Sequence, residues 1–171
     1  IKDSSQSLLS SVNDILDFFF FLKGELRLEE VPFSPIKILK SIKNNVRNNA
    51  ENKGLEFQFS KSNTIPDTLI GDPSRFAQVV NNVLNNAVKF TSKGFVKFDV
   101  DCHIKPDNRV SLIVKVADTG IGISKDKLNS IFDSFSQNDI NNKRKFGGLG
   151  LGLYIVKTLV DMQNGTIKME S

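Results

Sequence analysis

The sequence contains almost none of the residues from which disulfides and transition-metal sites are usually built. Among its 171 residues it has one cysteine, Cys102, and one histidine, His103. A single cysteine excludes an internal disulfide and a cysteine-cluster zinc site, and it fits a reducing compartment. A single histidine disfavours a histidine-based metal centre and a Ser-His-Asp triad, and we interpret His103 as a structural or surface residue.

Long apolar runs are missing as well. The longest, Ile15–Leu22, is interrupted by Asp17 and falls far short of the roughly 20 residues that cross a membrane. Lys2 and Asp3 lead into serine and leucine rather than an apolar segment, so no signal peptide is expected. The formal net charge of +4 suits a phosphate-bearing ligand but does not by itself indicate nucleic acid, and we expect no nucleic-acid partner.

The rest of the composition, 39% hydrophobic and 25% charged, is that of a chain that can bury one sizeable core. Residue spacing predicts helices over 1–23, 35–51, 73–90, 125–132 and 149–162, and strands over 26–31, 55–59, 94–103, 110–117 and 166–170. Ser34 is expected to cap the second helix, and residues 63–72 are expected to form a loop. Because these elements mix without regular βαβ alternation, we predict an α+β fold with a mixed, mostly antiparallel sheet covered by helices on one face.

The helix expected over residues 1–23 carries a heptad seam and ends near Gly24. The seam consists of Ile1, Leu8, Val12, Ile15, Phe19 and Leu22. An apolar stripe of this kind must be buried, and two explanations are open. The helix packs on its own domain, or it belongs to a helical bundle completed by a missing helix or a second copy.

The helix expected over residues 73–90 has an unusual polar face. On a helical wheel its apolar stripe spans an arc of about 100°, made up of Phe76, Val79, Val80, Val83, Ala87 and Phe90. A neighbouring arc of about 80° gathers Arg75, Gln78, Asn82, Asn86 and Lys89, whereas Asn81 and Asn85 point elsewhere. Amide oxygens suit a hard cation such as magnesium, and lysine suits phosphate. A solvated polar face is the alternative interpretation.

Two glycine-containing segments follow. Asp118–Gly122 comes after an apolar strand, where glycines let a ligand approach the backbone and Asp118 can accept from an exocyclic amine. Gly147–Leu153 opens the last helix, and free N–H groups at a helix start bind phosphate. Its spacing matches neither the Rossmann nor the Walker pattern. The preceding cations, Lys143, Arg144 and Lys145, belong either to a solvated loop or to a lid that closes on phosphates.

Together these segments resemble the GHKL ATP-binding fold, and specifically the catalytic domain of sensor histidine kinases. The matching segments are residues 71–91 (asparagine box), 118–123 (first glycine box), 131–137 (phenylalanine box) and 144–153 (second glycine box, in the form common among hybrid kinases). Residues 13–18 resemble the second helix of the dimerisation and phosphoacceptor domain. The resemblance implies a two-layer α/β sandwich, the Bergerat fold, over residues 25–171, preceded by that one dimerisation helix over residues 1–24.

The resemblance also implies ATP and Mg²⁺ as cofactors and a role for each motif residue. Asn86, helped by Asn82, would hold magnesium, Lys89 would contact phosphate, and Asp118 would accept from the adenine amine. The base pocket would be shaped by Gly120, Gly122 and Ile123. The phosphates would be lined by Gly148, Leu149, Gly150, Leu151 and Gly152, and the terminal phosphate reached by Arg144 or Lys143. The lid would be anchored by Phe132 and Phe135.

The activity implied is that of a protein histidine kinase, which transfers the γ-phosphoryl group of ATP to a histidine. No acceptor histidine matches the family pattern here, so we expect it on a dimerisation domain not included in this chain. The implied partners are that phosphoacceptor domain, a response regulator or receiver domain, and a second copy in a full-length homodimer. The implied location is a cytoplasmic domain, and sensor kinases of this kind are often membrane-anchored.

Position 82 separates kinases from hydrolases within the superfamily. Members that hydrolyse ATP carry glutamate one turn before the magnesium asparagine, where it activates water. Asn82 stands there, and an amide has no useful basicity near neutral pH, which favours a kinase over an ATPase. Two alternatives remain open: a non-catalytic GHKL nucleotide-binding module that regulates partners, and a GHKL hydrolase.

Overall fold

The computed structural model describes residues 2–128, 130–133 and 150–171, and for residues 2–11 it describes the backbone alone. The chain divides into two compact units. One unit spans residues 28–122, and the other combines the residues up to 27 with those from 123 onward. The candidate asparagines and Asp118 lie in the first unit, which is therefore the one that positions most of the candidate site.

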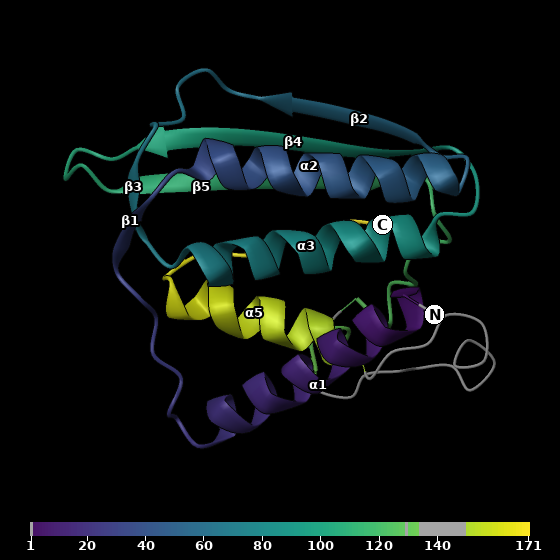
Figure 1. The fold of residues 1–171 in the computed structure, drawn as a ribbon, viewed down its shortest axis with the longest axis horizontal. Helices are drawn as coiled ribbons and strands as arrows, with labels where there is room; N and C mark the ends of the chain where they lie inside the picture. Colours follow the sequence, from purple (N-terminus) through teal and green to yellow (C-terminus); the bar gives the residue numbers. More distant parts are fainter. Residues whose placement is uncertain (1, 129, 134–149) are drawn as a thin grey trace. The chain divides into compact units, whose positions relative to one another are not determined.

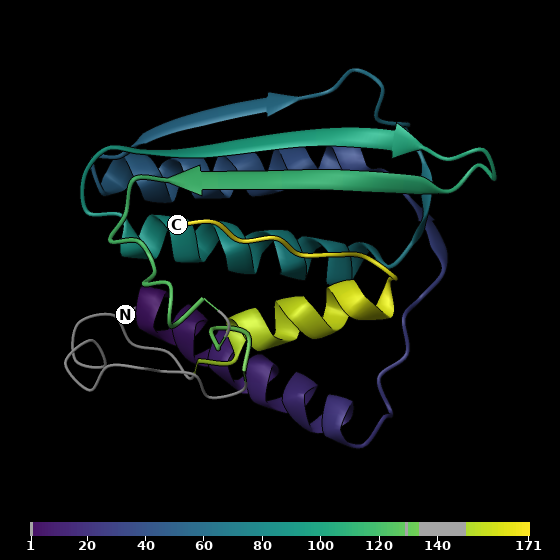
Figure 2. The ribbon, with the colours of Figure 1, turned by 180° about the vertical axis from the view of Figure 1, so that it is seen from behind.

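A three-stranded sheet forms one layer of the 28–122 unit. Its strands are β2 (Glu56–Lys61), β4 (Phe95–Ile104) and β5 (Val110–Asp118), in the spatial order β2-β4-β5. The β2–β4 pair is parallel and the β4–β5 pair is antiparallel. Helices α2 (Pro35–Asn52) and α3 (Pro73–Phe90) cover one face of this sheet (Figures 1 and 2). The predicted α+β fold, with a mixed sheet covered on one face, is confirmed.

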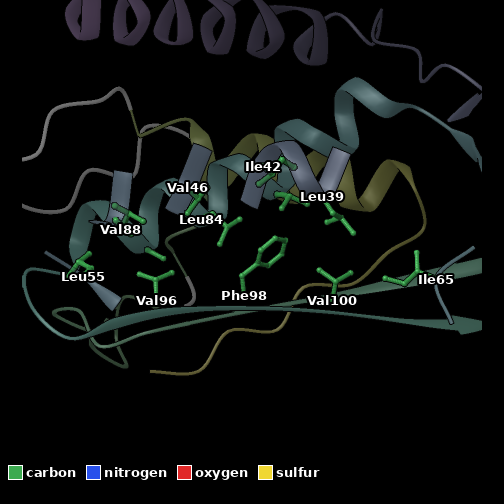
Figure 3. Packing of buried hydrophobic residues seen from close by; sticks show 13 residues of the cluster. Leu39, Ile42, Val46, Leu55, Ile65, Leu84, Val88, Val96, Phe98 and Val100 are labelled. Carbon is green, nitrogen blue, oxygen red and sulfur yellow. The ribbon is translucent and has the colours of Figure 1, made fainter. Parts of the chain in front are cut away.

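The core lies between the sheet and the two helices. Along β4 the buried residues alternate with outward-facing ones, as expected for a sheet with one covered face. Phe98, the largest fully buried side chain, projects from the middle of β4 toward the two helices (Figure 3). The side chains around it come from both helices and from β4: Leu39, Ile42, Val46, Leu84, Val88, Val96 and Val100.

Helix α2 begins at the predicted residue and ends one residue later than predicted. Ser34 is its N-cap and accepts a hydrogen bond from the backbone N–H of Lys37, while Pro35 occupies the first turn. At the other end the N–H of Lys53 donates to the carbonyl of Ala50 at 3.0 Å, and the N–H of Gly54 donates to that of Glu51 at 2.9 Å. Gly54 then takes a φ of +73°, a conformation that glycine adopts without strain, and the chain turns into β2.

A second, two-stranded sheet corrects two of the predictions. Strand β1 is Val31–Phe33 and pairs antiparallel with β3, Leu69–Gly71. The predicted strand over 26–31 was wrong, and the predicted 63–72 loop contains a strand. The alternation of apolar and polar residues along the sequence could not reveal β1 or β3, because so short a strand is defined by the strand with which it pairs. The β1 residue Phe33 packs on Phe76 of α3, with ring centroids 6.1 Å apart.

Helix α3 has the predicted bounds, but the wheel misplaced its core face. The buried residues are Val80, Leu84, Ala87 and Val88, whereas the predicted stripe omitted Leu84 and Val88 and included the half-buried Val79 and Val83. The apolar arc of α3 is wider than one sheet requires, so the wheel could not show which edge of the arc meets the core. Asp72 caps the helix by accepting from the N–H of Arg75, at 2.9 Å.

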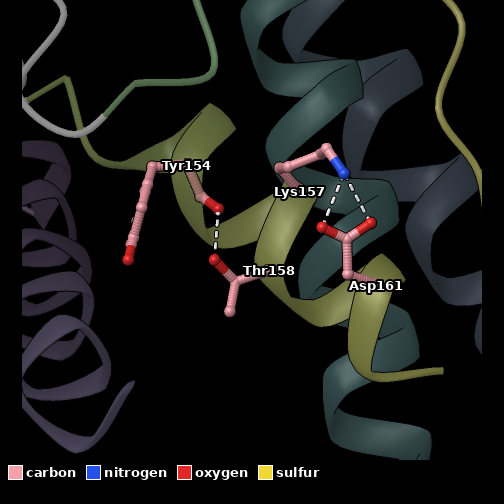
Figure 4. Close-up of polar contacts among 4 residues, drawn as sticks. All are labelled: Tyr154, Lys157, Thr158 and Asp161. Carbon is pink, nitrogen blue, oxygen red and sulfur yellow. Dashed lines mark hydrogen bonds and ion pairs between the residues drawn. The ribbon is translucent and has the colours of Figure 1, made fainter. Parts of the chain in front are cut away.

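The other unit contains α1 (Lys2–Leu22) and α5 (Gly152–Met162). Phe18 of α1 packs edge-to-face on Tyr154 of α5, with ring centroids 5.5 Å apart. Farther along α5 the hydroxyl of Thr158 donates to the Tyr154 carbonyl, and Lys157 pairs with Asp161 one turn on (Figure 4). None of the helices in the described part of the chain combines the length and apolar character needed to cross a membrane.

Three predicted elements of this unit differ in the structure. Residues 124–133, where a short helix was expected, form consecutive hydrogen-bonded turns at the positions described. Helix α5 begins at Gly152 rather than at Leu149, which lies outside the described residues. The predicted strand 166–170 was wrong. Within the described segment 150–171, residues 165–171 have no regular structure and no ladder partner, and Ser171 Oγ instead accepts from the N–H of Ile123, at 2.6 Å.

Candidate functional site

The turn that follows β5 packs on the C-terminal end of α3. The N–H of Ile121 donates to the carbonyl of Phe90, the last residue of α3, at 3.4 Å. Within the turn, the N–H of Gly120 donates to Asp118 Oδ1 at 2.8 Å. A Cβ atom at position 120 would lie 2.7 Å from the Phe90 carbonyl oxygen, so this approach requires glycine. The structure thus brings two predicted site residues, Asp118 and Gly120, against the predicted asparagine helix.

Thr91 stands at the junction of these two elements and is fully buried. Its hydroxyl donates to the Ala87 carbonyl at 2.7 Å and lies 3.4 Å from Asp118 Oδ1. A buried hydroxyl without a partner would be costly, so both contacts fix the side chain. Asp118 is exposed, and its Oδ2 has no hydrogen-bond partner among the residues described. That oxygen can accept from a ligand while Oδ1 holds the turn.

A second contact joins the same turn to the start of β4. The Thr119 hydroxyl accepts from the N–H of Phe95 at 3.0 Å and donates to the carbonyl of Lys93 at 3.1 Å. Gly94 lies between these partners with a φ of +110°, and a Cβ atom there would be 2.1 Å from Thr119 Oγ1. The sequence reasoning assigned no role to Gly94 or Thr119. The feature of the sequence that could have pointed to this contact was a glycine directly before a strand.

The asparagines of α3 differ in exposure. Asn85 is exposed, whereas Asn82 and Asn86 on the predicted polar face are half-buried; Asn81, which the wheel grouped with Asn85, is half-buried as well. The Nδ2 atom of Asn82 is buried and has no hydrogen-bond partner among the residues that the structure describes. Leaving a buried donor unpaired costs about 1–3 kcal/mol. A ligand oxygen that accepts from this amide would remove that cost, so Asn82 fits a site for a polar ligand.

Lys89 extends the polar face by one further turn. Its ammonium lies 5.0 Å from the centroid of the Phe90 ring. Burial lowers the pKa of the Lys89 ammonium below its usual value, because water is partly removed from the charge. An anion beside Nζ would replace that lost solvation. Lys89 is therefore suited to contact a phosphate at the edge of the site.

The residues present fit magnesium better than a transition metal. No group of three or more His, Cys, Asp or Glu side chains gathers anywhere in the described part of the chain. Magnesium needs no such group, since it binds through a few hard oxygen ligands and keeps several of its waters. The amide oxygens of Asn82 and Asn86 are ligands of that type. The donor set and the orphaned Asn82 amide are thus compatible with a magnesium-bound phosphate ligand.

Comparison with known proteins identifies the fold family. Residues 71–171 match the family described as "Histidine kinase-, DNA gyrase B-, and HSP90-like ATPase". The match covers more than half of the chain and includes both α3 and the 118–122 turn. The chain belongs to this family. It is a histidine kinase-type ATPase domain, as the four sequence motifs implied.

The curated relatives are sensor kinases. The whole chain aligns at 36% identity with the signal transduction histidine-protein kinase BarA of Escherichia coli, and covers 19% of that protein. It aligns over its full length at 39% identity with the hybrid signal transduction histidine kinase A of Dictyostelium discoideum, and covers 8% of it. The chain therefore spans about a fifth or less of the length of these relatives.

Solved structures of histidine kinases share the fold. Full-length ShkA, determined in complex with AMPPNP, superposes with a TM-score of 0.74 at 31% identity, over 96% of this chain and 33% of that one. The histidine kinase AdeS of Acinetobacter baumannii gives a TM-score of 0.64 at 19% identity, over 93% of this chain and 69% of that one, which shows the fold alone. An ATP-binding domain of the histidine kinase type is supported by both the family and the ShkA complex.

The remaining predicted residues of this ATPase domain are divided between the two units. Gly122, with a φ of +69°, ends the turn in the 28–122 unit. Ile123, Phe132, Gly150, Leu151 and Gly152 belong to the other unit. Five predicted residues lie outside the described part of the chain: Phe135, Lys143, Arg144, Gly148 and Leu149. The structure therefore assembles the asparagine and first glycine segments, and their relation to the second glycine segment stays a prediction.

The start of α5 has the local features expected of a phosphate-binding turn. Gly150 has a φ of +72°, and Leu151, the N-cap residue, is buried and makes no side-chain hydrogen bond to the helix. The N–H groups of the first turn therefore lack the side-chain acceptor that a Ser or Asp cap would supply. Such an end can bind an anion through its backbone.

The contact between Gly94 and Thr119 gives a direct test of how the turn is held. Gly94→Ala puts a methyl group onto the Thr119 hydroxyl at a φ of +110°, whereas Gly54→Ala has a φ of +73° and open space around it. Both substitutions carry a backbone cost, about 1–2 kcal/mol at Gly54 and at least as much at Gly94. Overpacking should make the loss of unfolding free energy in Gly94→Ala larger by at least about 1 kcal/mol. Urea denaturation measures both values, and equal losses would contradict the contact.

Proposed function

We propose that this chain binds Mg²⁺ and ATP and transfers the γ-phosphoryl group to a histidine on a phosphoacceptor helix domain outside the chain. One observation carries the proposal. The 118–122 turn packs on the C-terminal end of α3 within one unit, so the helix that carries the amide and ammonium groups and the turn that carries the Asp118 carboxylate are joined directly. These are the chemical groups that a magnesium nucleotide requires, and the family and the AMPPNP-bound ShkA relative agree with that ligand.

The triphosphate end of the ligand would lie along α3. Asn86, with Asn82, would supply amide oxygens to magnesium, and Lys89 would contact a phosphate oxygen. Bound magnesium neutralises part of the triphosphate charge and orients it. The buried Nδ2 of Asn82 would donate to a ligand oxygen or to a water held by the ligand. The protein contributes position and charge, which are the main terms in phosphoryl transfer.

The adenine would lie at the 118–122 turn. Asp118 Oδ2 would accept from the exocyclic amine, while Oδ1 keeps its bond to the Gly120 N–H. Gly120 and Gly122 allow the base to approach the backbone closely, and we assign Ile123 to the same pocket. Because guanine presents a carbonyl where adenine presents an amine, this carboxylate would select for adenine.

The second glycine segment would close over the phosphates. Gly150, Leu151 and Gly152 would line them through the backbone at the start of α5, together with Gly148 and Leu149. Arg144 or Lys143 would reach the terminal phosphate, and Phe132 and Phe135 would anchor this lid. These assignments rest on the family resemblance and on the uncapped start of α5.

Asn82 favours transfer to a side chain over hydrolysis. A hydrolase needs a base near the γ-phosphate to activate water, and an amide cannot serve as that base. In the proposed transfer an imidazole nitrogen of the acceptor histidine forms the new N–P bond as the O–P bond to ADP breaks. The imidazole N–H proton goes to solvent, and ADP leaves as the product.

Helix α1 supports a partner for this reaction. Its exposed apolar residues lie on one face and include Val12, Ile15, Leu16, Phe19 and Leu22. An exposed stripe of this kind is typical of a helix that packs in a bundle. We therefore assign residues 1–24 to a dimerisation and phosphoacceptor domain, residues 25–171 to the catalytic domain, and the full-length protein to a homodimer. A response regulator or receiver domain would then take the phosphoryl group, in a cytoplasmic phosphorelay.

The transfer itself can be tested with radiolabelled ATP. The chain is mixed with the His-bearing helix domain of a relative such as BarA, and label on that domain is followed by gel. We expect acid-labile label on the helix domain and almost no steady release of phosphate. Nucleotide binding without transfer would instead support a non-catalytic regulatory module. Steady release of inorganic phosphate by the chain alone would support a hydrolase.

Asn86 tests the magnesium assignment. Asn86→Ala removes one proposed ligand, and we expect the affinity for Mg²⁺ and AMPPNP to fall by at least about tenfold, since even indirect partners of bound metals contribute that much. Affinity measured without magnesium should change little. Asn85→Ala is the matched control, because Asn85 is an exposed asparagine on the same helix. Calorimetry that finds unchanged magnesium-dependent affinity in Asn86→Ala would exclude the assigned role.

Asp118 tests the adenine assignment. Asp118→Asn preserves an Oδ1 acceptor for Gly120 but replaces the free carboxylate oxygen with an amide that donates. We expect ATP affinity to fall by about tenfold or more, and GTP to become a better competitor. Asp101→Asn on the outer face of β4 is the control. If ATP and GTP compete in the same ratio before and after the substitution, Asp118 does not contact the base.

A further inference from the structure

Lys53 joins the end of α2 to the end of α3. Its ammonium donates to two main-chain carbonyls, that of Val88 at 2.6 Å and that of Lys89 at 2.8 Å. These carbonyls belong to the last turn of α3, where a helix has no N–H groups of its own left to bond them. Lys53 therefore supplies hydrogen bonds to the last carbonyls of the helix, as a C-cap glycine motif does in many other helices.

The last turn of α3 is completed by three different elements. Its final four carbonyls are those of residues 87–90. Thr91 bonds the Ala87 carbonyl through both its N–H and its hydroxyl, and Ile121 donates to the Phe90 carbonyl. Lys53 bonds the two that remain. The turn that presents Asn86 and Lys89 is thus held on one side by the 118–122 turn and on the other by Lys53.

Lys53 itself stands on a fixed backbone. Its N–H donates to the carbonyl of Ala50, and the next residue, Gly54, donates to that of Glu51 and turns the chain. Leu55 is buried directly afterwards, and its N–H donates to the Ala50 carbonyl at 2.9 Å. Because the backbone at both ends of the contact is anchored, the ammonium can hold the α3 carbonyls in place rather than follow them.

The charge of Lys53 matters as well as its hydrogen bonds. A helix C-terminus carries a partial negative charge of about half an electron. Here that end lies next to the asparagine and lysine side chains assigned to a triphosphate. An uncompensated negative end would repel the phosphates, and an ammonium bonded to the carbonyls offsets it.

We propose that Lys53 is a positioning residue of the nucleotide site, which holds and neutralises the C-terminal turn of α3 so that Asn86 and Lys89 meet the phosphates. This inference rests on the proposed function, because it assigns Lys53 to the same site. Lys53 acts through the main chain of α3 and has no contact with the ligand in this account.

The first test compares ligands with and without phosphates by calorimetry on the 171-residue chain. Lys53→Met should weaken binding of Mg²⁺ and AMPPNP by about fivefold or more, while adenosine affinity changes by less than about twofold. Lys53→Arg, which keeps charge and donors, should recover most of the AMPPNP affinity. Lys40→Met is the control, because Lys40 is an exposed lysine on the same helix.

Losses of equal size for AMPPNP and adenosine would show a general structural role and overturn the proposal. Unchanged AMPPNP affinity in Lys53→Met would overturn it as well. A wild-type chain that binds no AMPPNP would instead contradict the proposed function. The two failures are therefore distinguishable.

The second test measures, without any ligand, how firmly Lys53 holds the last turn of α3. Amide hydrogen exchange reports on the Thr91 and Ile121 N–H groups, which bond the first and last carbonyls of the turn. Lys53→Met should speed exchange of both amides by about fivefold or more relative to Lys40→Met. Urea denaturation shows whether each variant is folded under the conditions of the assay. Equal protection in the two folded variants would show that Lys53 does not hold the turn.

Discussion

The site depends on how the C-terminal end of α3 is completed. A helix leaves its last carbonyls without partners, and in this chain they are met by Thr91, by the 118–122 turn and by Lys53. Satisfying those carbonyls fixes the position of the turn relative to the helix. The same contacts therefore stabilise the fold and bring Asp118 next to the C-terminal end of α3, the helix that carries the polar face.

This arrangement explains why one set of residues can serve both base and phosphate recognition. Asp118 uses one carboxylate oxygen to hold its turn and leaves the other available. Asn82 has a buried amide nitrogen that lacks a partner in the described part of the chain, and Lys89 has an ammonium with reduced solvation. The Asn82 amide and the Lys89 ammonium both carry a cost of burial that a polar, anionic ligand would reduce. The unfavourable local features thus lie where the ligand is proposed to bind.

The sequence predicted the local elements that have strong end signals and missed those defined by distant partners. Ser34 with Pro35 marked the start of α2 correctly, and the predicted start of α3 at residue 73 was correct as well. Short strands such as β1 and β3 depend on each other across the ladder, so alternation alone could not find them. The site motifs were assigned through the family resemblance, and the roles of their residues stay predictions. The contacts of Lys53, Gly94 and Thr119 were not predicted, because nothing local indicates which distant carbonyl or hydroxyl such a residue will meet.

The most direct test of the central claim is an amide chemical-shift titration of the isotopically labelled chain with AMPPNP and Mg²⁺. The account predicts that, within the 28–122 unit, the largest shifts fall on residues 86–91 and 118–122 together. Shifts that are confined to the outer face of the sheet, around Lys97, Asp99 and Lys115, would place the ligand elsewhere and contradict the account.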